Sequence, residues 1–568
     1  MTQAENSTVT QAENSITGPP WKPAIFLLLV TFLVYSQIIR FPFINFDDTP
    51  FLVWTQASMQ WKMVPTYFLG ASDAAAKVPA PIPGFYRPVM IFWALLNSKM
   101  FGLHVWLWRI STLSLYLLSV WLFWRLAWKL THDDVIAFFA AMLYALHPMH
   151  VEGVAWLSGA VVEPLMAVFF LGSFLAYLRW RESGGITWLV ACLGLTLLAL
   201  LSKETAVALP VLIVAHALIF RRFEQDRPIR LSWLTFSMVT TVLLYMAMRI
   251  AAIRAVVVGG TPAHSWKEIF LTAPLLFVTF LKHALWPARL CTWYEIPVVH
   301  SAGEVAFYVP LALCLIYVAL LIWSLVRKPL AGFMLLWWAV CLVAPIMGLR
   351  VFGDNELLHD RFAFVALCGL CVLVAYVLRL LPKRGPILFG EPAAQVAVMA
   401  MVLIVMGALT TSLAYSWRSA LAMYTRAMET SPRNVRPRIL VATELMQQRK
   451  GGYALALALD TLKMAPDNWE SNYAAGLILA DMGDRPRALS VLQHGLDLHP
   501  ENRHLYLALA EVMVEGQDFA GAINLLQQGK SKSLRPDLLE RQIVIIREIQ
   551  LRQQNSILHP SQEQRSDH

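Results

Sequence analysis

The chain has few charged residues for its length. Only 15% of its 568 residues are Asp, Glu, Lys or Arg, and 58% are hydrophobic, whereas soluble proteins average about 25% charged residues. This shortage excludes an ordinary soluble enzyme and predicts an integral membrane protein. The net charge of +9 does not indicate a nucleic-acid partner, because most basic residues lie in short loops between apolar runs, which is typical of membrane topology.

Cysteine is also scarce. The six cysteines show neither a disulfide framework nor the spacing of a zinc site. Cys368 and Cys371 form a C-x-x-C within an apolar run, which favours small packing residues over redox chemistry. Residues 1–21 are polar and are predicted to form a disordered tail. No small-residue cleavage site follows the first apolar run, so we expect it to be a retained span rather than a signal peptide.

Long apolar runs are abundant. A transmembrane helix needs roughly 20 apolar residues, and eleven stretches qualify as predicted spans: 22–40, 105–128, 134–147, 157–178, 186–201, 205–220, 231–250, 304–326, 331–348, 361–380 and 394–415. With the amino terminus inside, basic residues fall in the inner loops only if a further apolar stretch, 268–287, does not cross. We expect that stretch to be an interfacial or re-entrant helix.

The composition becomes polar after the last predicted span, and the sequence repeats. Pro432, Pro466 and Pro500 are spaced by 34 residues, and an Asn follows each of them two positions later. This period, with small residues at helix crossings, is typical of tetratricopeptide repeats. We expect a short solenoid over residues 417–550, on the outer side because the number of spans is odd, and a disordered tail over residues 551–568.

Two adjacent carboxylates, Asp47 and Asp48, open the first outer loop, residues 41–104. Charges at a membrane boundary often only end a helix, and Asp suits a turn. The alternative is a site, because paired carboxylates at the water interface can bind a divalent cation or supply a general base.

Further polar clusters stand at the predicted outer ends of other spans. The candidates for substrate binding are Arg87, His147, His150, Glu152, Lys203, Glu204, Asp360 and Arg361. Each cluster also has a structural interpretation. The histidines could form an interfacial cap, the lysine could snorkel to the interface, and the arginine could pair with a nearby Asp or Glu. Together, acids, bases and phosphate-binding cations would share one interfacial cavity.

These clusters occur in a characteristic order. FINFDDTPFLV, LHPMHVEGVAWLSG, LLSKETAVALP and HDRFAFVAL precede the repeats. This order resembles the GT-C glycosyltransferases, in particular the transmembrane and TPR-containing protein O-mannosyltransferases and their bacterial relatives. The resemblance implies an all-α, GT-C-like bundle of about eleven spans over residues 22–416, followed by the solenoid. It also implies sugar transfer, with inversion, from a polyprenyl-phosphate donor to a hydroxyl, often Ser or Thr of a protein.

The resemblance also implies roles for individual residues. Asp47 would be the general base, and Asp48 would orient the acceptor or help to hold a divalent metal ion if one is used. Lys203 and Arg361 would stabilise the departing phosphate, with Arg87 and His150 behind them. One departure is Ala160, near a position where family members often carry Arg, which puts one phosphate or sugar contact in doubt.

The repeats would present or recruit a protein acceptor, since such stacks form concave peptide-binding surfaces. Lean loops and a short stack favour a bacterial inner membrane, with the repeats on the periplasmic side. An alternative is a non-catalytic, membrane-anchored TPR scaffold for envelope assembly, in which the polar clusters would be dispensable. A transporter would need polar residues deep within the spans, whereas most charges here lie at span ends.

Overall fold

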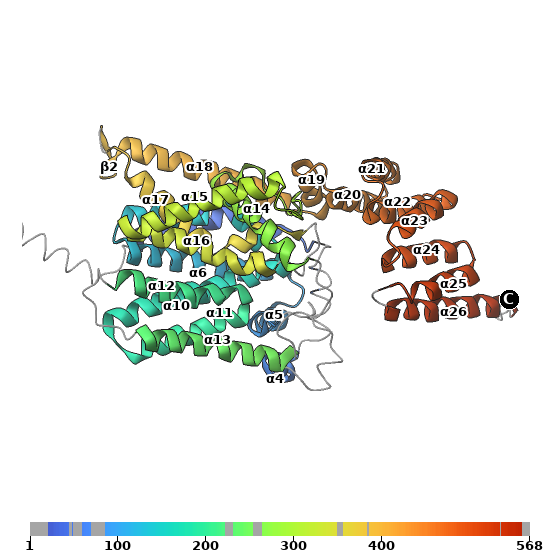
Figure 1. Cartoon of the computed structure of the whole chain (residues 1–568), viewed down its shortest axis with the longest axis horizontal. Coiled ribbons are helices and arrows are strands. Elements are labelled where there is room, and N and C mark those ends of the chain that lie inside the picture. Colours follow the sequence, from blue (N-terminus) through green and yellow to red (C-terminus); the bar gives the residue numbers. More distant parts are fainter. Residues whose placement is uncertain are drawn as a thin grey trace, which may run out of the picture. The chain divides into compact units, whose positions relative to one another are not determined.

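The fold divides into two compact units, residues 1–423 and 424–568 (Figure 1). The computed structural model describes residues 21–44, 48, 51, 60–69, 86–221, 231–253, 264–348, 356–382, 385–533 and 536–558. Most of both predicted disordered tails, and Asp47, lie outside these residues. The predicted all-α class is confirmed. In the described part of the chain the only sheet is a hairpin of β1 (Ile387–Leu388) and β2 (Glu391–Pro392), in which Ile387 pairs with Pro392.

The first unit is a helix bundle. Its longer helices are α2 (Trp21–Tyr35), α5 (Pro88–Phe101), α6 (Val105–Thr131), α7 (Asp134–Ala145), α10 (Val162–Ser183), α11 (Ile186–Ser202), α12 (Ala208–Phe220), α13 (Leu231–Ile253), α14 (Trp266–Leu285), α15 (Val305–Arg327), α16 (Pro329–Gly348), α17 (Leu367–Arg379) and α18 (Ala393–Ser416). The short helical turns are η1 (Ser36–Arg40), η2 (Trp61–Met63), α4 (Val64–Leu69), η4 (Pro148–His150), α8 (Val151–Ala155), α9 (Leu157–Ala160), η5 (Glu204–Val207), η6 (Pro287–Arg289) and η9 (Asp360–Ala363).

Every predicted span contains a helix, but the count of eleven is not confirmed. Among the described residues, eight helices are long and apolar enough to cross a membrane, and α7 with η4 and α8 makes a ninth if that pair, bent by 49°, counts as one span. Helices α11 and α17 and the stretch Glu204–Phe220 are apolar but shorter. They are short because polar turns at Lys203 and Asp360 interrupt the apolar runs.

The position of α14 is unusual. Near its start, Glu268 Oε1 lies 2.9 Å from Nδ1 of His300, just before α15 begins. Further along, the rings of Phe277 and Tyr317 are 4.9 Å apart. The two helices therefore run parallel, so the chain returns to its starting end between them, as expected of a re-entrant segment. Length and apolarity alone would nevertheless allow α14 to span.

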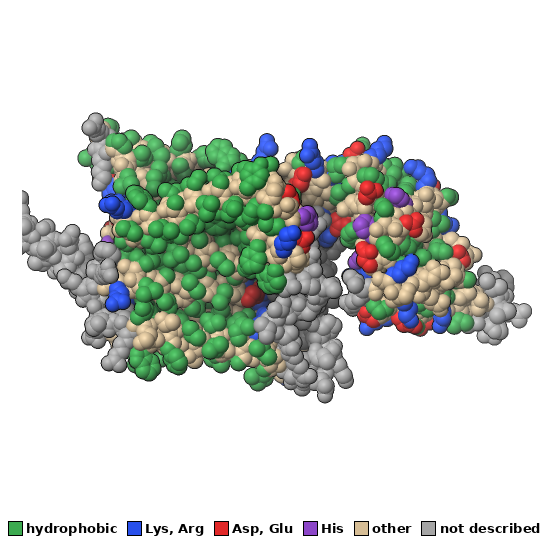
Figure 2. All heavy atoms as spheres, viewed as in Figure 1, with side chains coloured by type: hydrophobic (Ala, Val, Ile, Leu, Met, Phe, Trp, Pro, Cys, Tyr) green, Lys and Arg blue, Asp and Glu red, His purple; other side chains and the backbone are tan. Residues whose placement is uncertain are grey.

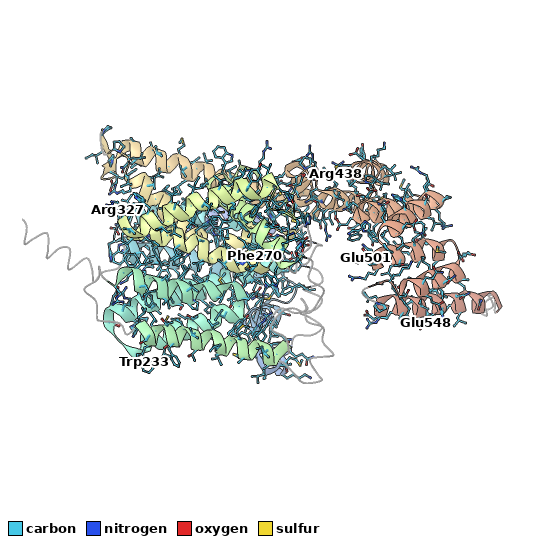
Figure 3. All side chains as sticks on the ribbon, viewed as in Figure 1. Trp233, Phe270, Arg327, Arg438, Glu501 and Glu548 are labelled. Carbon is cyan, nitrogen blue, oxygen red and sulfur yellow. The ribbon has the colours of Figure 1, made fainter. Side chains whose placement is uncertain are left out.

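The side of the bundle that faces the viewer in Figure 2 is largely apolar. Large side chains such as Leu315, Ile322 and Trp323 on α15 are more than half exposed, which suits a surface solvated by lipid. Arg327 and Trp233, at the end of α15 and near the start of α13, lie at the same end of the bundle (Figure 3). Both residues adjoin loops that are predicted to be inner, so their placement agrees with the predicted topology at this end.

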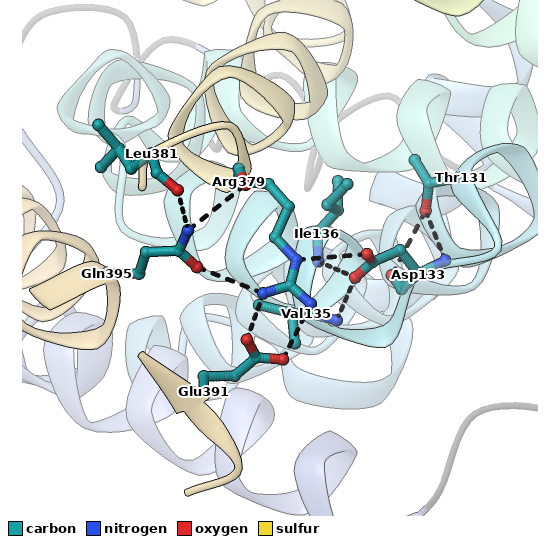
Figure 4. A network of polar contacts seen from close by, with 8 residues as sticks. All are labelled: Thr131, Asp133, Val135, Ile136, Arg379, Leu381, Glu391 and Gln395. Atoms are coloured by element: carbon teal, nitrogen blue, oxygen red, sulfur yellow. Dashed lines mark hydrogen bonds and ion pairs between the residues drawn. The ribbon is translucent and has the colours of Figure 1, made fainter. Parts of the chain in front are cut away.

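One end of the bundle is held by Arg379 (Figure 4). Its guanidinium forms an ion pair with Glu391, with Nη2 2.9 Å from Oε1, and lies 3.5 Å from Asp133 Oδ2. Gln395 accepts from the same guanidinium and donates to the carbonyl of Leu381 at 2.7 Å. Arg379 is one of the basic residues predicted for the inner loops, and this network joins α7, α17, the hairpin and α18.

The second unit is a helical-hairpin stack. Its helices, with α19 (Ala420–Thr430) leading in, are α20 (Val435–Gln447), α21 (Gly451–Met464), α22 (Trp469–Asp481), α23 (Arg485–Leu498), α24 (Arg503–Glu515), α25 (Phe519–Gly529) and α26 (Pro536–Leu558). The repeated Asn434, Asn468 and Asn502 each cap the helix that follows, by accepting a backbone N–H at 2.9–3.0 Å. This explains their 34-residue period.

Small residues permit the helix crossings of this unit. A Cβ at Gly476 would lie 2.4 Å from Cγ of Leu492, so α22 and α23 can approach this closely only without a side chain there.

The prediction that a disordered tail begins at residue 551 is wrong, because α26 continues to Leu558. That helix is anchored by buried Leu539, Ile543 and Ile546.

Candidate active site

The first outer loop is anchored by two buried charged side chains. Asp48 Oδ1 accepts the N–H of Ser158 at 2.7 Å, and Oδ2 accepts the N–H of Ile44 at 3.2 Å. Burial raises the pKa of Asp48, although the Ser158 N–H and the charge of Arg109 oppose this rise. Both carboxylate oxygens therefore hold backbone N–H groups in place, and Asp47, the predicted base, is the residue immediately before Asp48.

Arg109, near the start of α6, completes this anchor. Its guanidinium donates to the carbonyls of Phe41 at 2.9 Å, Pro42 at 2.7 Å and Ala155 at 2.8 Å. Its side chain is 1% exposed, so these three carbonyls take the place of water as its hydrogen-bond partners. The sequence interpretation missed Arg109. An arginine inside a predicted span was the available signal, since such residues are rare and usually functional or paired.

Arg361 is the most distinctive cation of the site. Its guanidinium lies 4.1 Å from the ring centre of Trp156, in a cation–π contact. Glu152 accepts the backbone N–H of Arg361 at 3.2 Å and Nδ1–H of His359 at 2.8 Å. Its Oε1 lies 3.7 Å from Nη1 of Arg361, so the Glu–Arg pairing alternative holds. Nη1 nevertheless has no hydrogen-bond partner among the described residues.

The predicted cation Lys203 forms a buried ion pair with Glu163, at the start of α10. Its ammonium also lies 5.0 Å from the ring centre of Phe362, next to Arg361 in the chain. Burial lowers the pKa of Lys203, while Glu163 opposes this fall. Glu163 was missed from the sequence, and its Oε2 has no hydrogen-bond partner in the described part of the chain. Lys203 is thus an inward-facing charge rather than a snorkelling one.

Two other predicted residues, Arg87 and Glu204, bind each other. The guanidinium and the carboxylate meet through two parallel contacts, at 2.9 Å for Nε and 2.5 Å for Nη2. This fork geometry fixes both planes. Glu204 adjoins Lys203, so this pair and the Lys203–Glu163 pair form one cluster from α5, α10 and the turn between α11 and η5.

Asp360 does not pair with the neighbouring Arg361. Its carboxylate lies 3.0 Å from Nδ1 of His283 and accepts the hydroxyl of Tyr294 at 2.5 Å. Burial raises the pKa of Asp360, and the His283 contact opposes this. The role that these contacts support is structural. Asp360 ties η9 to the end of α14 and to the segment after it, which holds the backbone of Arg361 in place.

The two histidines predicted for substrate binding serve the packing of the bundle. His147 caps η4 by accepting the N–H of Met149 at 3.3 Å, and its Nε2 lies 2.9 Å from the carbonyl of Ala284. His150 is fully buried, with its ring 4.2 Å from Tyr144 and 4.4 Å from Phe364. Their ring centres lie 6.4 Å apart, but both ring nitrogens of His147 already have backbone partners, so the pair does not offer two free nitrogens to a metal ion.

No group of three or more His, Cys, Asp or Glu suited to a metal ion occurs among the described residues. Asp47 and the side chain of Ala160 lie outside that description. The residues brought together are Asp48, Arg87, Glu152, Lys203, Glu204 and Arg361, with Asp360 behind them. Such a cluster can bind a phosphate through its cations beside a carboxylate-bearing loop.

Comparison with known proteins confirms the resemblance predicted from the motifs. Residues 479–534 match the tetratricopeptide repeat family. The chain is 22% identical over 476 residues to "Protein O-mannosyl-transferase TMTC3" of Mus musculus, covering 74% of this chain and 49% of that protein. It is 22% identical over 539 residues to "Protein O-mannosyl-transferase Tmtc3" of Drosophila melanogaster, covering 81% and 57%. The chain thus spans about half the length of the curated relatives it matches.

Among solved structures, the chain matches ArnT from Cupriavidus metallidurans bound to undecaprenyl phosphate. It has a TM-score of 0.38 and 15% identity, over 87% of this chain and 88% of that one.

Proposed function

We propose that the chain is a membrane glycosyltransferase of the GT-C class. It transfers a sugar from a polyprenyl-phosphate donor to a hydroxyl acceptor, in the first instance Ser or Thr of an exported protein. The observation that carries this proposal is the meeting of Arg361, Lys203 and Arg87 beside the Asp48 loop, at one end of a lipid-facing bundle. A lipid-linked phosphate and an aqueous hydroxyl would meet at such a place.

The proposed general base is Asp47. Both oxygens of its neighbour Asp48 already accept backbone N–H donors, so Asp48 positions the loop. Asp47 would take the proton of the acceptor hydroxyl while that oxygen attacks the anomeric carbon. The bond from the anomeric carbon to the phosphate oxygen breaks on the opposite face, and the polyprenyl phosphate leaves with the electron pair. The configuration of the sugar is therefore inverted.

The leaving phosphate needs donors that are in place before charge develops. Arg361 suits this role best, because Trp156 and Glu152 fix its plane while Nη1 keeps a donor without a hydrogen-bond partner among the described residues. Lys203 and Arg87 add positive charge nearby, although each is paired with a carboxylate. Relatives named protein O-mannosyl-transferases favour mannose as the first sugar to test and a protein as the acceptor.

We further propose that the site faces the outer side of a bacterial inner membrane, with the repeats in the periplasm. The basic residues of the opposite end, such as Arg327 and Arg379, support this orientation. The proposed binding partners of the chain are a lipid-linked sugar and a protein or peptide acceptor, and its bundle lies in the membrane.

The test uses the full chain purified in detergent. It is incubated with undecaprenyl- or dolichyl-phosphate sugars and an acceptor peptide, with and without EDTA, and released polyprenyl phosphate is measured. Asp47→Asn should release no polyprenyl phosphate. Loss of release by the wild type when EDTA is added would establish a metal requirement. Lys62→Gln, on the described part of the same outer loop, should retain activity.

Equal release by Asp47→Asn would overturn the assignment of the base. If no donor and no acceptor gives release, the scaffold alternative replaces the enzyme, and the polar clusters become structural.

A further inference from the structure

One face of the solenoid carries a cluster of three aromatic rings, of which two are stacked. On neighbouring helices α22 and α24, Trp469 and His504 stack with their ring centres 5.7 Å apart and their planes at 17°. Tyr473 lies 6.3 Å from Trp469 and 6.2 Å from His504. All three side chains are only partly buried, so part of each ring is open to a partner.

Carboxylates gather towards the other end of the same two helices. Asp481, Glu511 and Glu515 are exposed, and no ion pair joins any of them to another residue in the part of the chain that the structure describes. Partial burial and the charges of Glu515 and Asp481 raise the pKa of Glu511. The negative ends of both helix dipoles add to this field.

The rings and the carboxylates share helices α22 and α24, and His504, Glu511 and Glu515 follow the seven- and four-residue spacing of one helix face. Glu511 acts electrostatically on Tyr473 and raises the pKa of its hydroxyl together with burial. By contrast, Glu470 at the start of α22 is paired with Arg436 at 2.5 Å. The carboxylates without an ion pair therefore lie beyond Tyr473, where the Arg485 guanidinium donates to the backbone carbonyl of Glu515 at 3.0 Å and not to a carboxylate. In Figure 2, acidic and histidine side chains lie close together on the visible face of the second unit.

We propose that this aromatic–acidic face, made of Trp469, Tyr473, His504, Asp481, Glu511 and Glu515, binds an extended polypeptide segment that carries Lys or Arg. A cationic side chain over the Tyr473 ring would gain a cation–π contact. It would also reduce the repulsion among the three carboxylates, none of which forms an ion pair with a described residue. Nucleic acid and anionic lipid headgroups have the wrong charge for this face.

The inference deepens the proposed function, on which it rests for one point only: that the bound segment belongs to the acceptor protein. The solenoid would then select acceptors by a basic segment separate from the Ser or Thr that receives the sugar. Recognition of the acceptor and chemistry would be the tasks of different surfaces.

The experiment measures fluorescence anisotropy with the full-length protein in detergent. The probes are two labelled peptides of Ser, Thr and Pro, one with regularly spaced Lys and the other with Glu in those places. The Lys peptide should bind, the Glu peptide should not, and added salt should weaken binding. The double variant Asp481→Asn/Glu511→Gln keeps the side-chain shapes and should bind the Lys peptide about tenfold more weakly. Glu548→Gln, an exposed acid on α26, should bind like wild type.

Equal binding of the Glu peptide, or an unchanged dissociation constant in the double variant, would overturn the inference. The assay contains no sugar donor, so it does not depend on catalysis. Asp47→Asn should bind the Lys peptide as wild type does. Binding without transfer by the wild type would overturn the proposed function alone, and transfer to peptides irrespective of their charge would overturn this inference alone.

Discussion

At the scale of single residues, Arg361 is the side chain proposed to contribute most to stabilising the leaving phosphate. The ring of Trp156 and the carboxylate of Glu152 fix a planar group that lysine does not possess. Arg361→Lys keeps the charge but loses the stacked fork of donors. We expect about a hundredfold loss of kcat/KM, the scale of losing one preorganised donor to a developing anion, measured as polyprenyl phosphate release.

The matched control is Arg418→Lys. That guanidinium also lies 4.1 Å from the centre of an aromatic ring, Tyr415, but the Arg418 side chain is exposed. It should leave kcat/KM within about twofold of wild type, as expected of a surface substitution. Equal loss in both variants would mean that the effect at Arg361 is structural.

How far the site could be predicted also differs from residue to residue. Lys203, Glu204 and Arg361 could be found because a charge at the end of an apolar run is conspicuous. Their partners could not all be found, since Glu163 looks like one more acid beside a helix until the fold places it against Lys203, 40 residues away. The partners of His147 and His150 could not be found either, because each ring meets a backbone carbonyl from a distant segment, that of Ala284 or of Phe364.

At the scale of helices, the contact between α16 and α17 depends on one glycine. A Cβ at Gly369 would lie 2.5 Å from the carbonyl oxygen of Met334 and 3.1 Å from Cβ of Trp337. Backbone cannot move aside as a flexible side chain can. Gly369→Ala should therefore destabilise the protein by about 1–3 kcal/mol, the usual cost of overpacking, measured as a lower midpoint of thermal unfolding in detergent.

Gly194→Ala provides the control. A Cβ there would meet nothing within 4 Å, and alanine favours helix by about 1 kcal/mol over glycine. Its unfolding midpoint should stay the same or rise. A fall as large as that of Gly369→Ala would show that the loss of glycine itself, not the close contact, is responsible.

Helix existence was predictable and helix length was not. All twelve apolar stretches contain helices, as lipid requires of backbone polar groups. Their ends depend on turns such as η4, η5 and η9, where charged side chains find partners from distant parts of the chain. Apolar content alone cannot show those partners, which is why the count of eleven full spans is not confirmed. In the solenoid, repeated asparagine caps marked the helix starts locally, so the period was readable.

At the scale of the whole molecule, the two ends of α15 test the proposed orientation. Ser301 precedes the helix and Lys328 follows it, and both are exposed. A membrane-impermeant maleimide added outside intact spheroplasts should label Ser301→Cys and not Lys328→Cys, with both labelled after detergent is added. The wild type serves as the blank, because its six cysteines are buried or partly buried.

The reverse labelling pattern would place the site on the cytoplasmic side. A donor on the outer leaflet would then be out of reach, and the proposed localisation of both the site and the repeats would have to be abandoned.

The way in which the chain leaves the bundle has a kinetic consequence. Only Trp417–Ser419 separate α18 from α19, and the ring of Trp417 is stacked on Trp156, the same ring that supports Arg361. An acceptor held by the solenoid would be a tethered reactant at millimolar effective concentration, as short connections provide. An acceptor that the active site alone binds weakly would then be transferred at bulk concentrations near its dissociation constant from the solenoid. A peptide that docks on the solenoid without an acceptor hydroxyl would act as a competitive inhibitor.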